Sequence, residues 1–358
     1  MKNDAYIGLG SNLGDRAAHL RAALEALEAH PAIQICRVSE FYDTAPLAGR
    51  SQGPYLNAVA CLETTLGPTD LLEQMRAIEA DGGRIRDEPW QSRTIDLDLL
   101  LYGDQVISTP ELTVPHPAMH LRSFVLKGLC QVNAEAVHPV LKRTAAQLYG
   151  RLNGGDYYLD PARPQLISVA GLIGVGKTTL AARLAETLGA TLLCEPYADN
   201  PYLPDVYAGC TDVALGSELF FLSSSAMQLR RDRLASGRPF VSDYVFDKAK
   251  IYASSWLGAR DLACYRKHYA CVVKQIAAPV VVVYLTDDIQ RCLERIHRRN
   301  RPYEQGIEAG FLTDLKQKYD DLYDHWTVCP VIRIEASRCA SPEQAAGWAE
   351  DIRHYITP

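Results

Sequence analysis

The stretch LISVAGLIGVGKTTLAARLAETLG, residues 166–189, decides the fold of the second half of the chain. It opens with an apolar run short enough for a buried strand, passes through a glycine-rich turn and continues as a helical pattern that Gly189 closes. The turn, GLIGVGKT at 171–178, fits G-x-x-x-x-G-K-[ST] between a strand and a helix. Backbone N–H groups of such a turn surround phosphates at a helix N-terminus, so the sequence predicts a nucleotide site.

Within this turn, Lys177 is expected to reach the outer phosphates and Thr178 to bind one Mg²⁺. The predicted phosphate-binding residues are Gly171, Gly174, Gly176, Lys177, Thr178 and Thr179. Further strands and helices alternate along the chain, which predicts a doubly wound α/β domain with a parallel sheet. The strands are expected at 190–196, 238–246, 278–286 and 331–336, and the helices at 214–235 and 289–299.

The composition is that of an ordinary globular protein. The 358 residues are 47% hydrophobic and 22% charged, with a net charge of −6, which gives no reason to expect nucleic acid or an anionic membrane as a partner. Ten scattered cysteines without a CxxC pair indicate free thiols in a reducing compartment. The first residues lack a secretory signal, and no apolar run approaches the ~20 residues that span a bilayer. We therefore expect a cytoplasmic protein.

A polar, turn-rich segment divides the chain. Residues 151–165, RLNGGDYYLDPARPQ, are expected to link a first domain at 1–150 to a second at 166–358. In the first domain short strands and amphipathic helices interleave, which predicts an α+β sandwich of the ferredoxin-like type. The strands are expected at 5–11, 38–44, 57–65 and 94–103, and the helices at 15–30, 68–80 and 121–129.

The most informative segment of the first domain is RIRDEPWQSRTIDLDLLLYG, residues 84–103. Because alternate side chains of a strand share a face, Asp96 and Asp98 point away from the apolar face. Two such carboxylates can hold a pair of Mg²⁺ ions for phosphoryl transfer, and the upstream Arg84, Arg86 and Arg93 can bind phosphate oxygens. Taken alone, D-x-D also fits an edge strand with a solvated acidic face.

The wider context resembles the 6-hydroxymethyl-7,8-dihydropterin pyrophosphokinase family over residues 4–145. The segments that carry the resemblance are YIGLGSNLGDR (6–16), SEFYDTAPL (39–47), YLNA (55–58), IEADGGRIR (78–86), WQSRTIDLDLLLYG (90–103) and VPHPAMHLRSF (114–124). Their order and spacing match the family, which is more specific than any one motif. The resemblance implies transfer of pyrophosphate from ATP to the pterin hydroxymethyl group, with release of AMP.

By matched position, the resemblance implies that Asp96 and Asp98 hold two Mg²⁺ and that Arg84 and Arg93 bind the ATP phosphates. His116 and Arg122 would also serve the nucleotide. The implied pterin pocket consists of Thr44, Leu47, Tyr55, Asn57, Trp90 and Phe124. Departures from the family pattern occur in the loop at Pro89 and at Gln91-Ser92, and after the motif histidine at Pro117.

Residues 165–335 resemble the deoxynucleoside kinase family at lower identity. The resemblance rests on CEPYADNPYL (194–203), ELFFL (218–222), SDYVFDKAKIYA (242–253) and RIHRRNRPYEQGI (295–307). It implies that Glu195 is the general base on the sugar 5′-hydroxyl and that Asp243 lies near this hydroxyl. Arg299 and Arg301 would close a lid on the ATP phosphates, and Glu218 would take the base-reading position.

Three departures leave the second activity open. Glu218 replaces a glutamine that reads the base, Ser225 replaces an arginine, and Tyr244 replaces the arginine of the family's DRS motif. The leading hypothesis is a bifunctional enzyme that uses ATP and Mg²⁺ at both sites. The alternatives are an active pyrophosphokinase with a nucleotide-binding or oligomerisation module, and a nucleotide sensor without either activity. The second resemblance also implies a homodimer, with the helix at 214–235 as the candidate surface.

Overall fold

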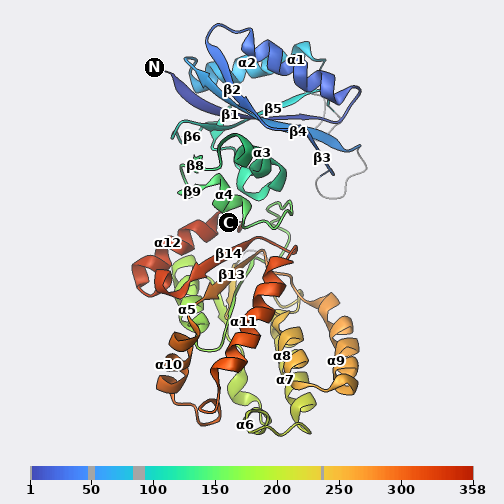
Figure 1. The fold of residues 1–358 in the computed structure, drawn as a ribbon, viewed down its shortest axis with the longest axis vertical. Helices are drawn as coiled ribbons and strands as arrows, with labels where there is room; N and C mark the ends of the chain where they lie inside the picture. Colours follow the sequence, from blue (N-terminus) through green and yellow to red (C-terminus); the bar gives the residue numbers. More distant parts are fainter. Residues whose placement is uncertain (1, 47–52, 84–92, 235–237, 358) are drawn as a thin grey trace. The chain divides into compact units, whose positions relative to one another are not determined.

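The protein is represented by a computed structural model that describes residues 2–46, 53–83, 93–234 and 238–357 (Figure 1). Contacts divide the chain into two compact units, Met1–Tyr158 and Leu159–Pro358. The segment predicted as a linker is therefore shared between them, because Arg151 and Leu152 are buried in the first unit whereas Gln165 is buried in the second. Within the described residues, no helix has the length and apolar character needed to cross a membrane.

The first unit contains an antiparallel sheet in the order β2-β4-β1-β5, with β3 paired to β4. Together with α1 and α2 this gives the β-α-β-β-α-β order and strand arrangement of a ferredoxin-like sandwich, which confirms the predicted fold class. The elements are β1 (Asn3–Ser11), α1 (Arg16–Glu28), β2 (Ile33–Val38), β3 (Tyr42–Thr44), β4 (Tyr55–Thr64), α2 (Pro68–Asp81), β5 (Asp96–Tyr102) and α3 (Ser123–Asn133).

The remaining elements of this unit are short. They are β6 (Ile107–Ser108), β7 (Thr113–Val114), η2 (Met119–Leu121), β8 (Val137–His138), β9 (Arg143–Thr144) and α4 (Ala145–Tyr149). Helices α1 and α2 cover one face of the sheet and α3 lies on the other (Figure 1). The strand predicted at 38–44 is only partly right. Residues 42–44 form β3, whereas Val38 ends β2, whose residues 33–37 were not predicted as a strand. At Ser39, between the two strands, the hydroxyl accepts the N–H of Val59 at 2.9 Å.

Strand β5 separates a core face from a polar face, as its alternation predicts. Ile95, Leu97 and Leu99 are buried against α1 and α2, whereas Asp96 and Asp98 are half-buried on the opposite face. The carboxylate of Glu79, itself buried in α2, accepts the N–H of Leu97 at 2.8 Å. This bond ties the helix layer to the strand that carries the aspartates.

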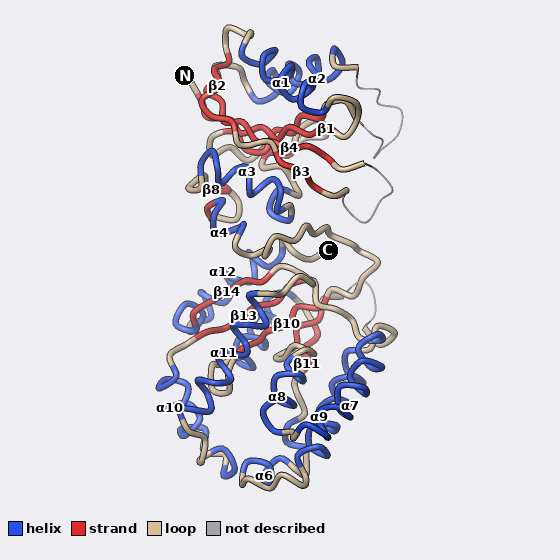
Figure 2. Tube along the Cα trace, turned by 45° about the vertical axis from the view of Figure 1, so that its right-hand side comes forward, coloured by secondary structure: helices blue, strands red, loops and turns tan. Residues whose placement is uncertain are grey.

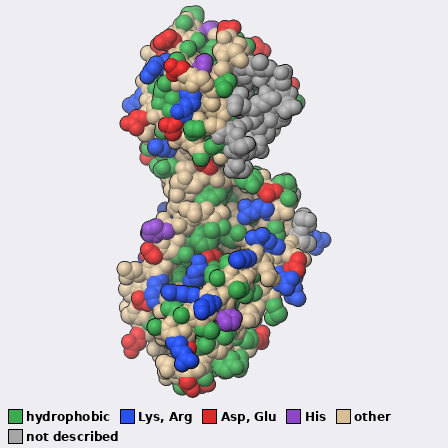
Figure 3. Space-filling model, turned by 90° about the vertical axis from the view of Figure 1, so that its right-hand side faces the viewer, with side chains coloured by type: hydrophobic (Ala, Val, Ile, Leu, Met, Phe, Trp, Pro, Cys, Tyr) green, Lys and Arg blue, Asp and Glu red, His purple; other side chains and the backbone are tan. Residues whose placement is uncertain are grey.

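The second unit has a five-stranded sheet in the order β11-β12-β10-β13-β14, and every strand pair in it is parallel. The predicted strand positions and the parallel sheet are confirmed. The strands are β10 (Leu166–Gly171), β11 (Thr191–Leu193), β12 (Phe240–Ser242), β13 (Val281–Thr286) and β14 (Val331–Glu335). Figure 3 shows that Lys and Arg side chains gather on one face of this unit.

Helices surround the sheet, and α7, α8 and α9 lie side by side next to it (Figure 2). The sequence did not predict α6, α8, α9, α11 and α12, and it extended α7 too far. The chain leaves α7 after Leu229 because Arg230 pairs in a bridge with Ile276. The helices are α5 (Lys177–Leu188), α6 (Leu203–Tyr207), α7 (Ala214–Leu229), α8 (Lys248–Trp256), α9 (Ala259–Val272), α10 (Ile289–Arg299), α11 (Ala309–Asp324) and α12 (Pro342–Arg353), with short turns η3 (Tyr197–Asp199), η4 (Val273–Gln275), η5 (Pro302–Glu304) and η6 (Ala336–Cys339).

The glycine-rich turn is set by two close backbone approaches. Gly171 has φ 141°, and a Cβ there would lie 2.4 Å from the carbonyl oxygen of Leu285. At Gly174, with φ 77°, a Cβ would lie 2.5 Å from the carbonyl oxygen of Cys292. Only glycine fits both the conformation and the space at these positions.

We expect Gly171→Ala to lower the free energy of unfolding of the second unit by roughly 2–4 kcal/mol, since the added carbon meets rigid backbone in a strained conformation. Gly209→Ala is the matched control. Its φ is 92° but nothing lies within 4 Å of the added carbon, so we expect about 1–2 kcal/mol from conformation alone. Urea unfolding followed by tryptophan fluorescence measures both, because Trp256, Trp326 and Trp348 lie in this unit. An equal loss of unfolding free energy in both variants would show that the close approach to the Leu285 carbonyl does not destabilise Gly171→Ala.

Candidate active sites

A pocket of about 370 Å³ opens on the polar face of the first unit's sheet. It brings together nine of the residues singled out in the sequence, from β3, β4, β5 and the segments beside them. They are Thr44, Tyr55, Asn57, Arg93, Asp96, Asp98, His116, Arg122 and Phe124. Arg84, Leu47 and Trp90 lie outside the described residues.

The polar half of this pocket pairs acids with cations. Arg93 Nη1 lies 2.5 Å from Asp96 Oδ2, and Arg122 Nη1 lies 3.7 Å from Asp98 Oδ2. The main chain of Arg93 exchanges two hydrogen bonds with Asn12, at 2.7 and 3.1 Å, and these fix the approach to β5. Two carboxylates beside two guanidinium groups provide oxygen ligands for Mg²⁺ and donors for phosphate oxygens.

His116 is held as a neutral ring. Its Nδ1 accepts the N–H of Ala118 at 3.2 Å, which leaves the proton on Nε2, 3.9 Å from Asp98 Oδ1. Burial, and next the positive charge of Arg122, lowers the pKa of His116 to about 4. The ring is therefore an N–H donor rather than a cation at neutral pH.

The apolar half of the pocket has aromatic walls and one amide. Tyr55 and Phe124 line it, and Asn57 Nδ2 donates to Thr44 Oγ1 at 2.7 Å. A Cβ at Gly10 would lie 3.0 Å from Asn57 Oδ1, so this glycine leaves room for the amide.

Tyr42 also lines this wall, although the sequence did not predict it. Its hydroxyl donates to the Phe124 carbonyl at 2.7 Å, and burial raises its pKa. Its only sequence signal was its place inside the quoted segment SEFYDTAPL.

A second pocket, of about 120 Å³, lies beside the glycine-rich turn of the second unit. Of the predicted residues it brings together Gly174, Lys177, Thr178, Glu195, Glu218, Asp243, Arg299 and Arg301. Gly171 and Gly176 shape the turn without lining the pocket, and Thr179 is exposed on α5.

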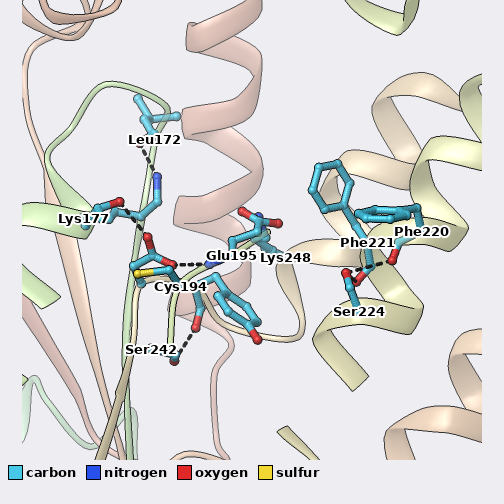
Figure 4. Close-up of polar contacts among 12 residues, drawn as sticks. Leu172, Lys177, Cys194, Glu195, Phe220, Phe221, Ser224, Ser242 and Lys248 are labelled. Atoms are coloured by element: carbon cyan, nitrogen blue, oxygen red, sulfur yellow. Dashed lines mark hydrogen bonds and ion pairs between the residues drawn. The ribbon is translucent and has the colours of Figure 1, made fainter. Parts of the chain in front are cut away.

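Asp243 links three segments of this pocket. Its Oδ2 accepts the hydroxyl of Thr178 at 2.6 Å, and its Oδ1 accepts the N–H of Glu195 at 2.9 Å. Lys177 Nζ donates to the Leu172 carbonyl at 2.7 Å (Figure 4). Burial, and next the charge of Lys248, lowers the pKa of Lys177 to about 8. Phosphate-binding and acid groups thus meet at the carboxyl ends of β10, β11 and β12.

Arg299 and Arg301, which the sequence predicts to form a lid, are held by one acid. Arg299 Nη2 lies 2.5 Å and Arg301 Nη1 lies 3.2 Å from the carboxylate of Glu304, which is buried. The guanidinium of Arg301 also stacks 3.8 Å from the ring centroid of Tyr197. These contacts keep both arginines at the pocket, where an incoming phosphate can compete for them.

The three departures from the kinase pattern lie in different surroundings. Glu218 and Ser225, both on α7, are buried and line the pocket. Tyr244 is fully buried behind the pocket, where its hydroxyl donates to Gln228 Oε1 at 2.9 Å. Burial raises the pKa of Glu218 to about 8, with Glu195 adding to this effect and Lys248 opposing it.

A parallel sheet with a phosphate-binding turn, next to a sandwich with paired aspartates among arginines, defines a chain with two phosphotransferase domains. Residues 6–134 match the family described as 7,8-dihydro-6-hydroxymethylpterin-pyrophosphokinase (HPPK), and residues 167–356 match the family described as deoxynucleoside kinase. The chain belongs to both families, with an HPPK domain followed by a deoxynucleoside kinase domain. Kinases of these families use ATP with Mg²⁺ and act on small molecules.

Curated relatives match the first domain. The 2-amino-4-hydroxy-6-hydroxymethyldihydropteridine pyrophosphokinase of Bacillus subtilis is 39% identical over 163 residues, which are 44% of this chain and 98% of the relative. The Haemophilus influenzae protein of the same name is 43% identical, over 38% of this chain and 84% of the relative. The Pseudomonas aeruginosa protein of the same name is 44% identical, over 36% of this chain and 78% of the relative.

Solved structures match the second domain more distantly. A deoxyadenosine kinase from M. mycoides with dCMP and dCDP bound is 21% identical and has a TM-score of 0.44. The match covers 51% of this chain and 95% of that one. The same kinase with dATP bound is 22% identical and has a TM-score of 0.43. The match covers 48% of this chain and 91% of that one.

The state of Glu218 gives a pH-dependent prediction. With a folded-state pKa of about 8 against 4.5 in the unfolded chain, this group's contribution to stability is complete below pH 4.5 and is lost as the pH rises toward 8. Glu218→Gln cannot titrate. We therefore expect it to be more stable than the parent by a few kcal/mol at pH 8, at about 1.4 kcal/mol per unit of pKa difference, with the difference fading toward pH 5.

Urea unfolding of both proteins at pH 5, 6.5 and 8 measures this difference. Glu186→Gln, at an exposed position of α5, is the control and should show no such trend. A stability difference that stays constant with pH would mean that Glu218 is ionised in the folded protein.

Proposed function

We propose that both domains are catalytically active and that the chain is a bifunctional transferase. The first domain transfers pyrophosphate from ATP to 6-hydroxymethyl-7,8-dihydropterin, and the second phosphorylates the 5′-hydroxyl of a deoxynucleoside. The observation that carries the proposal is that each pocket combines its acids, cations and substrate-facing groups in one place.

In the first domain, Asn57 would pair with the polar edge of the pterin, and Tyr55 and Phe124 would stack on its ring. The hydroxymethyl oxygen bonds to the β-phosphorus of ATP and its proton passes to solvent water. The bond between the β-phosphorus and the α–β bridging oxygen breaks, and this oxygen leaves with AMP. Arg93 and Arg122 would bind the phosphate oxygens as charge moves between them. Neutral His116 can donate from Nε2.

Asp96 and Asp98 would hold two Mg²⁺. Their carboxylate oxygens, half-buried on one strand face, suit this hard cation. Among the described residues, no group of three or more His, Cys, Asp or Glu side chains has a metal-binding arrangement. Mg²⁺ bound through one or two carboxylates usually keeps several waters and binds substrate phosphates as well. When bound, the ions neutralise phosphate charge.

In the second domain, Glu195 would accept the proton of the nucleoside 5′-hydroxyl. The 5′-oxygen would attack the γ-phosphorus of ATP, and ADP would leave. Lys177, Arg299 and Arg301 would bind the phosphate oxygens, and Glu218 and Asp243 would contact the nucleoside side of the pocket. Thr178 would bind one Mg²⁺. Its hydroxyl donates to Asp243 at 2.6 Å, which places it beside the nucleoside side of the pocket.

One alternative is kept for the second domain. Tyr244 takes the place of an arginine, and both lid arginines are engaged by Glu304. These features favour a nucleotide-binding or assembly module that joins an active pyrophosphokinase. Against this alternative, Glu195 and Lys177 share one pocket and Asp243 fixes the main chain of Glu195.

We further propose a cytoplasmic homodimer. All ten cysteines are free thiols, which suits a reducing compartment. Helix α7 is the candidate dimer surface and exposes 55% of Met227. Light scattering on the purified chain gives the oligomeric state directly.

For the first activity, we expect Asp96→Asn and Asp98→Asn each to slow AMP formation from hydroxymethyl-dihydropterin and ATP by roughly 10³-fold or more, because each loses a charged Mg²⁺ ligand. More Mg²⁺ should be needed for half-maximal rate. Glu63→Gln, which removes a surface acid paired with Lys2, is the matched control and should leave the rate unchanged. Activity within threefold of the parent in both variants would rule out this assignment.

For the second activity, the purified chain is given ATP, Mg²⁺ and each of the four deoxynucleosides, and monophosphate formation is measured beside Glu195→Gln. We expect turnover of at least one nucleoside and a fall of roughly 10²–10⁴-fold in the variant, the usual contribution of a general base. If the parent converts none of the four deoxynucleosides while it still forms AMP from ATP in the presence of the pterin, the kinase function is wrong. The second domain would then be a nucleotide-binding or assembly module.

A further inference from the structure

Lys248, the first residue of α8, reaches into the kinase pocket and forms an ion pair with Oε2 of Glu195 (Figure 4). The sequence motifs predicted no role for this residue. Its side chain is 13% exposed and that of Glu195 is 14% exposed, so the pair is largely removed from water. A pair buried to this degree is held in one geometry, and losing either partner leaves an uncompensated charge.

Aromatic rings surround the ammonium group. The Nζ atom lies 5.3 Å from the ring centroid of Tyr252, 5.7 Å from that of Phe221 and 5.9 Å from that of Tyr244. Cations within about 6 Å of a ring centroid are attracted to it. The rings come from α7, α8 and the segment between β12 and α8, so three parts of the chain fix the position of one charge.

The ion pair gives the two carboxylate oxygens of Glu195 different surroundings. Oε2 is bound by Lys248, and the main-chain N–H of Glu195 is bound by Asp243 at 2.9 Å. Oε1 accepts no hydrogen bond from any residue that the structure describes. The side chain is therefore restrained at one oxygen and at its backbone, while the other oxygen can accept a proton from a bound substrate.

Lys248 also explains how the site can tolerate Tyr244. The Tyr244 hydroxyl is directed to Gln228 on α7, and its ring lies beside the lysine. The positive charge that the motif position lacks is thus present in the pocket, carried by a side chain four residues further along the chain.

We propose that Lys248 is a positioning residue of the phosphoryl-transfer site, which holds Oε2 of Glu195 so that Oε1 takes the proton of the nucleoside 5′-hydroxyl. This proposal rests on the kinase function proposed above. In the step, the proton moves to Glu195, the 5′-oxygen bonds to the γ-phosphorus, and ADP leaves with the electrons of the broken P–O bond. Lys248 acts on this step only through Glu195.

The test is a double-mutant cycle on the full chain, with the deoxynucleoside that the parent turns over best. We expect Lys248→Met to lower kcat by roughly 10²–10³-fold, within the range of general-base effects, and to change the KM for ATP less than threefold. Lys248→Arg should recover most of the rate. In the Glu195→Gln background, Lys248→Met should change kcat by less than about threefold, because coupled residues are not additive.

Lys250→Met is the matched control, since Lys250 lies on the same helix but pairs with Asp247 at the surface. AMP formation by the first domain and the urea midpoint of the second show that each variant is folded. A full effect of Lys248→Met in the Glu195→Gln background, or unchanged kcat in Lys248→Met, would overturn the proposal while the kinase function stands. A parent chain that phosphorylates none of the four deoxynucleosides would overturn both.

Discussion

The carboxylate of Asp243 is the constraint on which the second active site depends. One oxygen binds the hydroxyl of Thr178 at the start of α5, and the other binds the main chain of Glu195 beyond β11. Three segments that are distant in sequence are thereby fixed at the same edge of a parallel sheet, where the carboxyl ends of the strands meet. A buried carboxylate with two short hydrogen bonds costs far more to displace than an exposed one. The placement of the phosphate-binding turn and that of the acid are therefore coupled.

The first active site depends on the alternation of one strand. Because β5 presents Leu97 and Leu99 to one core, Asp96 and Asp98 must face the other side, where the pocket lies. A shift of the strand by one residue would bury both carboxylates. Glu79 opposes such a shift from α2 by binding the N–H of Leu97. The register of β5 therefore decides both the packing of its apolar side chains and the exposure of the two aspartates to the pocket.

Both sites pair positively charged side chains with acids. Arg93 lies on Asp96, Arg299 and Arg301 on Glu304, and Lys248 on Glu195. The arginine pairs keep cations inside the pockets, where phosphate oxygens can exchange for or join the carboxylates, whereas Lys248 stays on Glu195. The pairs also limit the charge that each pocket carries when its substrate is absent.

The sequence by itself determined the two families, the fold class of each domain and the parallel sheet of the second. The β5 alternation and the glycine-rich turn depend on neighbouring residues, so local patterns and spacing were sufficient. Other features were decided only by tertiary structure. Lys248 and Tyr42 act through contacts between distant segments, and the burial that raises the pKa of Glu218 comes from surrounding helices. The end of α7 likewise depends on Arg230 meeting Ile276. Electrostatic and packing partners of this kind are set by distance in space, which a linear pattern does not encode.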